Sequence, residues 1–258
     1  MTHWVRFALP GGPPQFGTLA DGTIAVHTGT MFDHPAPTPG RVALADVRLL
    51  APVVPSKTIA LWNNFRALGT KLGLAVPDEP LWFIKAASSY ADPGATVRRP
   101  PGYAGKVVFE GELVIVIGKT CRNASPAEAA AAIFGYTCVN DITAADILNK
   151  DPSFAQWSRA KSFDGFGPMG PVIATGLDPA TLVVRTVLNG AERQNFPIAD
   201  MVFPAAELVS RISHDVTLMP GDAICCGTSL GVGVMRDPVN TVDVTIDGIG
   251  TLSIMYEN

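Results

Sequence analysis

The hydrophobic residues of this chain occur mostly in short runs separated by glycine, proline and asparagine, a pattern typical of strands joined by turns. The run at 107–117, Val-Val-Phe-Glu-Gly-Glu-Leu-Val-Ile-Val-Ile, contains two acids. Successive side chains of a strand point to opposite faces, so Glu110 and Glu112 are predicted to share one face. Neighbouring carboxylates repel each other and are costly near a core, and a bound cation would offset both effects. The alternatives are a solvent-facing edge or pairing with arginine or lysine.

The remaining apolar runs predict further strands and two tight hairpins. Asn189-Gly190 is a two-residue turn signal at the end of one run, and Asp247-Gly248 separates the last two runs of the chain. Strands are predicted at 5–7, 23–26, 59–62, 172–175, 182–188, 242–246 and 251–256.

Helix signals are fewer. The clearest helix begins at Ser125 as the N-cap, with Pro126 at the first helical position and Glu128 completing a capping box. Alanines continue this helix, and Gly135 is predicted to end it. A second short helix is predicted at 207–213. The pattern as a whole indicates a strand-dominated α+β fold.

The positions of the prolines suggest that the chain has two domains. Residues 1–52 are predicted to form a small N-terminal β-rich domain, in which the prolines at 35–39 make a stiff connection near the boundary. Residues 53–258 form the larger domain. Its segment 65–72 is interpreted as a helix or mobile loop, and the glycines around it make it a candidate lid over a site.

Composition narrows the class of protein. At 258 residues, with 47% hydrophobic and 16% charged residues, the chain can bury a large core and is expected to be compact rather than disordered. A net charge of −4 without a basic run argues against nucleic acid or an anionic membrane as partners. No apolar stretch approaches the roughly 18 residues of a membrane span, and the N-terminus lacks a signal-peptide pattern.

Cysteine and histidine spacing argues against zinc. The chain has no Cys-x-x-Cys and no His-x-x-x-His, so a metal here would be held by oxygen, as Mg²⁺, Mn²⁺ and Ca²⁺ are. The cysteines are interpreted as reduced, mostly buried thiols of a cytoplasmic protein. They are Cys121, Cys138, Cys225 and Cys226.

A third acid follows the first two. The apolar run that begins at Gly135 ends in Asn140-Asp141, and Asp141 comes 29 positions after Glu112. That separation accommodates the rest of one strand, a helix and a return strand, which can bring Asp141 beside the two glutamates. Three carboxylates around a divalent cation leave about three of its six octahedral positions for water or substrate.

Two glycine-rich segments are candidate walls of such a site. The segment 161–171 places Lys161 before a Gly/Pro-rich turn, and 220–233 contains Gly227-Thr228, whose N–H groups and hydroxyl can hold an anion. An ordinary surface loop is the alternative for the first. The second is not a P-loop, because no lysine follows its glycines.

Together these motifs resemble the fumarylacetoacetate hydrolase superfamily. The resemblance covers roughly residues 55–258. It rests on Glu110-x-Glu112, Asn140-Asp141, the 161–168 motif Lys-Ser-Phe-Asp-Gly-Phe-Gly-Pro, and the glycine pattern of 221–233.

The resemblance implies a mixed β-roll, a homodimer, and Mg²⁺ or Mn²⁺ held by Glu110, Glu112 and Asp141. It implies a 2-oxo acid or 1,3-dicarbonyl substrate, such as an acylpyruvate, that reacts through a metal-stabilised enolate. Lys161 would act at the enolate. The implied substrate-binding residues are Phe163, Asp164, Gly227 and Thr228.

The segment 64–71 departs from the family pattern. Many hydrolytic members carry a His and a Glu that activate water, and here Leu68 and Lys71 stand in their places. The Asn64-Phe65-Arg66 variant is similar to the 2-hydroxyhepta-2,4-diene-1,7-dioate isomerase/decarboxylase members of aromatic catabolism. Leucine cannot transfer a proton. The resemblance therefore favours decarboxylation or isomerisation over C–C bond hydrolysis.

Two questions stay open at this level. Arg66, Lys71 or His34 are candidates for the missing base, and nothing in the sequence places them. The competing class is a non-catalytic metal- or metabolite-binding relative. Three retained acids count against it, because an unneeded carboxylate cluster would be destabilising.

Overall fold

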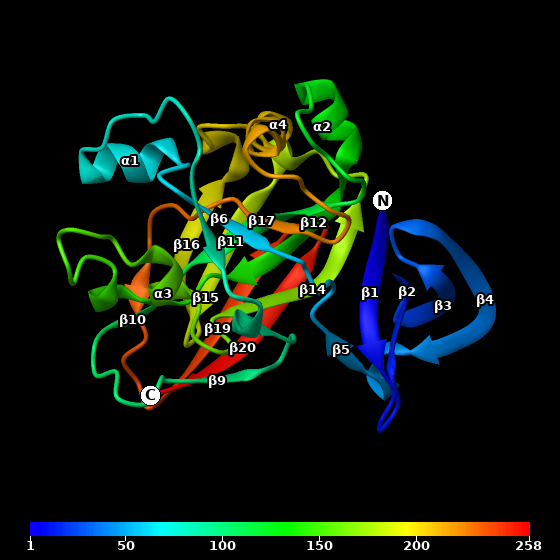
Figure 1. The fold of residues 1–258 in the computed structure, drawn as a ribbon. Coiled ribbons are helices and arrows are strands. Elements are labelled where there is room, and N and C mark those ends of the chain that lie inside the picture. Colours follow the sequence, from blue (N-terminus) through cyan, green and yellow to red (C-terminus); the bar gives the residue numbers. More distant parts are fainter.

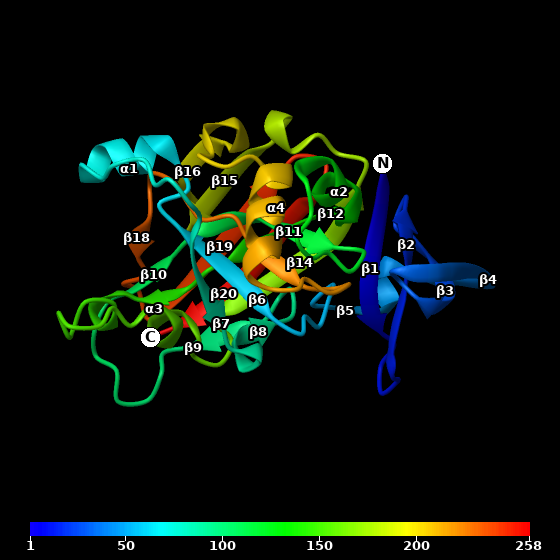
Figure 2. The ribbon, with the colours of Figure 1, turned by 45° about the horizontal axis from the view of Figure 1, so that its top comes forward.

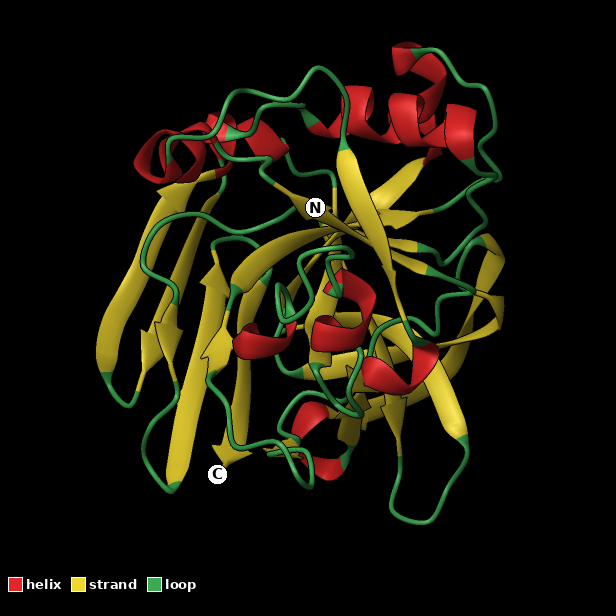
Figure 3. Cartoon of the chain, turned by 60° about the vertical axis from the view of Figure 1, so that its left-hand side comes forward, coloured by secondary structure: helices red, strands yellow, loops and turns green.

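The computed structural model describes residues 1–258 and is strand-dominated, as predicted (Figure 3). The helices are α1 (Arg66–Leu72), α2 (Pro126–Ala132), α3 (Trp157–Lys161) and α4 (Ala205–Asp215). The strands are β1 (Thr2–Ala8), β2 (Pro14–Ala20), β3 (Thr23–Thr30), β4 (Asp33–Ala43), β5 (Arg48–Leu50), β6 (Thr58–Trp62), β7 (Leu81–Lys85), β8 (Tyr90–Ala91), β9 (Thr96–Arg98), β10 (Val107–Phe109), β11 (Gly111–Ile117), β12 (Ile133–Asn140), β13 (Thr143–Ala144), β14 (Gly167–Thr175), β15 (Val183–Leu188), β16 (Ala191–Pro197), β17 (Ala223–Cys225), β18 (Gly233–Val234), β19 (Val239–Ile246) and β20 (Gly250–Glu257).

Three sheets organise the chain. The largest has the order β4-β3-β2-β1-β14-β12-β11-β17-β6-β7, with β5 paired to β1 and β8 to β14. A five-stranded sheet has the order β16-β15-β19-β20-β9, and a small one has the order β13-β10-β18. The strands β10 and β11 therefore belong to different sheets, although only Glu110 separates them in the chain.

The N-terminal strands β1 to β5 form a wing at one side of the molecule (Figure 1). The large sheet nevertheless continues into this wing, because β1 pairs with β14 through Thr2 opposite Thr175. The division into 1–52 and 53–258 thus separates two lobes that share one sheet. It stays a prediction.

The proline-rich segment is not a connection. The prolines of 35–39 lie inside β4, the outermost strand of the large sheet. An edge strand tolerates proline because one of its two rows of N–H groups has no ladder partner. The pairing of β3 with β4 also shifts register twice, as expected where the ladder is interrupted.

The capping box at the start of α2 is confirmed, and the predicted end of this helix is wrong. Ser125 accepts the N–H of Glu128, whose carboxylate accepts the N–H of Ser125 at 2.9 Å. The helix ends at Ala132, and Ile133 enters β12 directly. Gly135 lies within that strand, where a Cβ atom would lie 2.5 Å from the carbonyl oxygen of Ala174. This glycine permits close strand packing.

The later elements agree with the sequence. Asn189 and Gly190 both have positive φ, as the turn joining β15 and β16 requires. The final pair β19 and β20 is the predicted hairpin, and α4 contains the predicted helix at 207–213. All four cysteines are buried and free. No helix is long and apolar enough to cross a bilayer.

Buried side chains fall into two clusters on opposite faces of β11. Leu113 and Ile115 belong to the larger one, which also contains the inner sides of α2 and α4; these helices lie side by side in Figures 1 and 2. Val114 and Val116 belong to the smaller one, together with Cys225 of β17. Because Glu112 shares a face with Val114, the acids lie at the border of the smaller cluster.

Candidate metal centre

The structure brings Glu110, Glu112 and Asp141 together. One carboxylate oxygen from each lies within 4.8 Å of the others. Glu112 pairs directly with Val139 across β11 and β12, and Asp141 follows two residues later on the same side. Antiparallel pairing therefore joins acids that are far apart in the sequence.

The predicted single strand at 107–117 breaks at Glu110. Its N–H is donated to the side-chain oxygen of Asn140 at 3.0 Å, and its carbonyl accepts the N–H of Asp141 at 2.8 Å. A Cβ atom at Gly111 would lie 2.1 Å from the hydroxyl oxygen of Thr186. A residue with a side chain would clash there, so glycine lets the chain turn from one sheet into the other.

The side chain of Lys161 extends from the end of α3 to the clustered carboxylates. Its Nζ atom donates to Glu110 Oε2 at 2.8 Å and to Asp141 Oδ2 at 2.5 Å, and its side chain is almost fully buried. Burial acts to lower the pKa of Lys161, but Asp141 and Glu110 outweigh burial and raise it. Lys161 is therefore an ammonium group that can donate hydrogen bonds and cannot accept a proton.

A second lysine was missed by sequence reasoning. Lys85 ends β7, and its buried Nζ atom lies 2.5 Å from Asp141 Oδ1 and also donates to the carbonyls of Lys161 and Phe166. The available signal was an apolar strand, Leu-Trp-Phe-Ile, that ends in lysine. Lysine is almost never fully buried unless it is paired. Lys85 fixes Asp141 and the end of α3 relative to each other.

The three acids differ in how well their charges are compensated. Burial acts to raise the pKa of Asp141, but Lys161 and Lys85 outweigh it and lower that pKa. Glu112 has a single hydrogen-bond donor, the N–H of Gly227 at 2.9 Å. Burial, and then the charge of Asp141, raise the pKa of Glu112 well above its usual range.

Glu110 is intermediate between these two. It accepts from Lys161 and from the hydroxyl of Thr143 at 3.1 Å. Burial raises the pKa of Glu110, Lys161 lowers it, and Asp141 raises it again, so the net pKa is raised. The two lysines pair with Asp141 and Glu110, and Glu112 is the acid that lacks a cationic partner.

This donor set fits a divalent metal. All three acids offer hard oxygen ligands, and each carboxylate oxygen has a second lone pair beside the one that a lysine uses. A cation would supply the partner that Glu112 lacks. The cluster can therefore bind a divalent metal.

A network of hydrogen bonds fixes the loop beside the acids. The Thr228 hydroxyl donates to the carbonyl of Gly111 at 3.0 Å and accepts from Gln194 Nε2 at 2.8 Å. Gln194 Oε1 in turn accepts the N–H of Gly111 at 2.9 Å. The single hydroxyl proton of Thr228 is thus already donated within the protein. Its predicted role in holding a substrate carboxylate stays a prediction, as does that of Gly227, and Gln194 is a further residue that sequence reasoning missed.

Phe163 and Asp164 lie beside a different hollow. Phe163 packs between Tyr103 and Phe166, with ring centroids 6.3 and 5.3 Å away. Asp164 is exposed and lines a cavity of about 560 Å³ together with Arg98 and Arg99. No hydrogen bond or ion pair joins Phe163 or Asp164 to the three acids, so their contact with substrate stays a prediction.

The segment 66–72 is a helix and carries no acid or histidine. Leu68 packs against the larger buried cluster, while Arg66 and Lys71 are exposed. His34 is on β4 in the wing, on the far side of the molecule from α1 in Figure 1. None of the three candidate bases has a hydrogen bond or ion pair to the acids.

Comparison with known proteins agrees with these motifs and identifies the family. Residues 57–254 match the model of the fumarylacetoacetate hydrolase C-terminal domain. The chain belongs to the fumarylacetoacetate hydrolase family. Residues 2–52 match a separate model, the Rv2993c-like N-terminal domain.

Several relatives are similar over most of their length. Protein Rv2993c of Mycobacterium tuberculosis is 42% identical over 86% of this chain and 84% of its own. Oxaloacetate tautomerase YisK of Bacillus subtilis is 37% identical over 82% of this chain and 73% of its own. The crystal structure of 2-hydroxyhepta-2,4-diene-1,7-dioate isomerase from Mycobacterium marinum is 38% identical, covers 100% of this chain and 98% of its own, and superimposes with a TM-score of 0.90.

Proposed function

We propose that this protein is a Mg²⁺- or Mn²⁺-dependent isomerase of a 2-oxo acid of the acylpyruvate type, and that it interconverts keto and enol tautomers. The observation that carries the proposal is Lys161, an ammonium group 2.8 and 2.5 Å from two of the three clustered acids. Glu110, Glu112 and Asp141 would hold the metal. When bound, the metal would polarise the 2-oxo group and stabilise negative charge on its oxygen.

The protein's own residues then supply binding and charge. Lys161 points a positive charge at the place where a chelating substrate would meet the acids, so it would donate a hydrogen bond to the developing enolate oxygen. Lys85 would hold Asp141 and the end of α3 in position. The N–H of Gly227 would keep Glu112 oriented, and the network of Gln194 and Thr228 would keep the adjacent loop rigid.

The composition of α1 supports isomerisation over C–C bond hydrolysis. Hydrolysis needs a group that activates water. Leu68 cannot activate water, and Lys71 is exposed and has no hydrogen bond or ion pair with the acids. Tautomerisation moves one proton between C3 and the 2-oxo oxygen of the substrate through the stabilised enolate, and unlike hydrolysis it needs no activated water. The names of two similar proteins, an oxaloacetate tautomerase and a dienedioate isomerase, point in the same direction. Decarboxylation of the keto form is the second candidate, on the α1 observation alone. Loss of carbon dioxide would leave the electrons of the broken C–C bond as an enolate, which the metal and Lys161 would stabilise until it takes up a proton from solvent.

We also propose a homodimer in the cytoplasm, on the family resemblance and the absence of disulfides among the four cysteines. Size-exclusion chromatography with light scattering tests the dimer. A single species of monomer mass at micromolar concentration would refute it.

The function is tested with metal-free protein and a panel of 2-oxo acids that includes oxaloacetate. We expect Mg²⁺ or Mn²⁺ to restore keto–enol interconversion by the metal-free protein, measured as a fall in the ultraviolet absorbance of the enol. Neither carbon dioxide nor a carboxylate fragment should appear among the products. Release of carbon dioxide would support the decarboxylase, and a carboxylate fragment the hydrolase. If metal binds but no substrate changes, the protein is a non-catalytic relative, and if metal does not bind, the metal-enolate proposal fails altogether.

A further inference from the structure

Three aromatic side chains form a cluster beside the acids. The ring of Trp157 lies 4.7 Å from that of Trp62 and 5.7 Å from that of Phe83, and the planes of Phe83 and Trp157 are within 28° of each other. All three side chains are only partly buried. We call Trp62, Phe83 and Trp157 the aromatic shelf.

The shelf shares one face with the lysines of the metal centre. Phe83 and Lys85 are two residues apart on β7, so they point to the same side of the sheet. Trp157 and Lys161 are four residues apart on α3, which places them on the same side of that helix. Lys161 Nζ lies 5.9 Å from the centroid of the Phe83 ring. The aromatic shelf is therefore directly adjacent to the metal centre.

A glycine separates the shelf from the acids. Strand β17 lies between β11 and β6, and Gly227 follows β17. Its N–H is donated to Glu112, and a Cβ atom there would lie 3.2 Å from the carbonyl oxygen of Leu61, next to Trp62 in the chain. Gly227 therefore packs closely against the end of β6 while its N–H holds Glu112, so the carboxylate and Trp62 lie on either side of this glycine.

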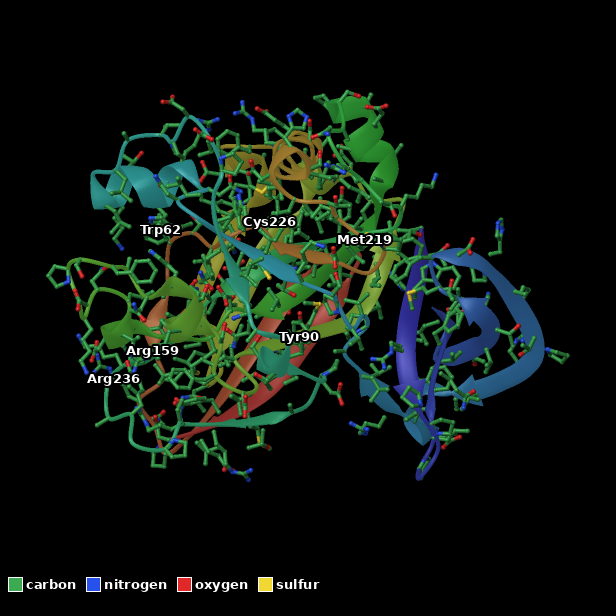
Figure 4. The ribbon with its side chains drawn as sticks, in the orientation of Figure 1. Trp62, Tyr90, Arg159, Met219, Cys226 and Arg236 are labelled. Atoms are coloured by element: carbon green, nitrogen blue, oxygen red, sulfur yellow. The ribbon has the colours of Figure 1, made fainter.

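Charge is also distributed unevenly around the shelf. The acids and lysines lie at one end, where Lys161 of α3 pairs with Glu110 and Asp141. In Figure 4 Trp62 lies on the side of the molecule where α1 and α3 are. A ligand that binds the acids through its polar end would reach the partly buried aromatic rings of the shelf with its other end.

We propose that the aromatic shelf binds the non-reacting part of the substrate, and that this part is planar and apolar. The inference rests on the proposed function, because the 2-oxo acid end of the same molecule would be at the metal centre. An aryl or conjugated substituent at C4 of an acylpyruvate has the required shape. It would stack on Trp62 and Trp157 in the offset or tilted arrangements that aromatic rings prefer. Oxaloacetate has a carboxylate in that place and gains nothing from an apolar surface.

The test compares two ligands that differ only where they would meet the shelf. They are 2,4-dioxo-4-phenylbutanoate and 2,4-dioxopentanoate, which carry a phenyl and a methyl group on the same 2,4-dioxo acid. Dissociation constants are measured by isothermal titration calorimetry with Mg²⁺ present, and oxaloacetate turnover is measured in parallel. We expect the phenyl compound to bind about tenfold more tightly.

Three variants assign that preference to the shelf. Trp62→Ala should remove it, and so should Trp62→Leu, which keeps apolar bulk at the strand end but not a flat ring. The control is Trp82→Ala, at the neighbouring position on the opposite face of β7, where the indole donates to Asp215 instead. It should retain the tenfold preference, and circular dichroism checks that all variants are folded.

Each outcome separates this inference from the proposed function. Equal affinities in the wild type, or a preference that survives in Trp62→Ala, would overturn the shelf while oxaloacetate turnover still supports the isomerase. A preference that survives only in Trp62→Leu would show that bulk rather than planarity matters, and would overturn the planar substrate class. If neither ligand binds and oxaloacetate is not turned over, both proposals fall together.

Discussion

The carboxylate–lysine cluster and helix α1 differ in almost every physical respect. The cluster consists of Glu110, Glu112, Asp141, Lys85 and Lys161, which are bonded to one another or to the backbone and are all buried except the partly exposed Glu110. The charged residues of α1, Arg66 and Lys71, are exposed.

This contrast corresponds to two requirements of enolate chemistry, which are stabilising negative charge and transferring a proton. Stabilising negative charge needs fixed, desolvated groups, because an electrostatic interaction is strongest where water is excluded. Moving a proton needs a group that can both gain and lose it. The cluster provides the groups that stabilise negative charge, and α1 carries no group bonded to these acids that could transfer a proton. Isomerisation and decarboxylation need no activated water, so the lack of a base on α1 disfavours C–C bond hydrolysis more than either of them.

Within the cluster, Asp141→Asn should give the largest effect. Asp141 is the only acid that contacts both lysines, and removing its charge leaves Lys85 without a carboxylate partner. Breaking a buried ion pair costs about 3–5 kcal/mol. We expect the free energy of unfolding of the metal-free protein, measured with urea, to fall by that amount.

The matched variant is Glu112→Gln. This carboxylate has no cationic partner and a raised pKa, so its neutral isostere should leave metal-free stability unchanged or higher while weakening Mg²⁺ binding. Equal destabilisation by Asp141→Asn and Glu112→Gln would contradict the charge assignment within the cluster.

Lys161→Met should lower turnover more than it lowers metal affinity. Removing one hydrogen-bond donor to a developing oxyanion costs about 10²–10³-fold in kcat. The measurement is kcat for the active 2-oxo acid at saturating Mg²⁺, with the dissociation constant of the metal determined separately. A rate within twofold of the wild type would remove Lys161 from the mechanism.

Ser125→Ala should affect stability alone. The variant removes the cap of α2, which costs about 1 kcal/mol, and should leave kcat and Mg²⁺ affinity unchanged. Hydrogen bonds from the backbone and then the side chain of Ser125 lower the pKa of Glu128. A lowered folded-state pKa contributes stability above the unfolded pKa, and this is lost as the pH falls through the folded value. The difference between wild type and Ser125→Ala should therefore shrink in acid, and a constant difference would argue against the capping box.

Lys71→Ala should have the smallest effect. The side chain is exposed and has no hydrogen bond or ion pair, and exposed substitutions of this kind usually stay within 0.5 kcal/mol. We expect kcat/KM to stay within about twofold. A loss of tenfold or more, without a change in stability, would show that α1 carries the missing proton-transfer group and would break the division between the two regions.

Local patterns were reliable where one short segment decides the outcome. The capping box at Ser125, the turn at Asn189-Gly190 and the alternation around Glu112 each depend on neighbouring residues, and each is present in the structure. The end of α2 was predicted wrongly, because Gly135 is needed for contact with the distant Ala174 rather than for a helix cap. That contact is visible only once β12 and β14 are paired.

The sequence by itself determined the three acids, the approximate strands around them and the lack of a water-activating pair at Leu68 and Lys71. Only the tertiary structure decided which cations compensate those acids, because Lys85 and Lys161 reach Asp141 from separate elements. It also decided that Glu112 is the carboxylate left without a cation. Strand alternation reports which residues share a face, whereas the partner of a buried charge depends on which distant side chains the fold brings within hydrogen-bond distance.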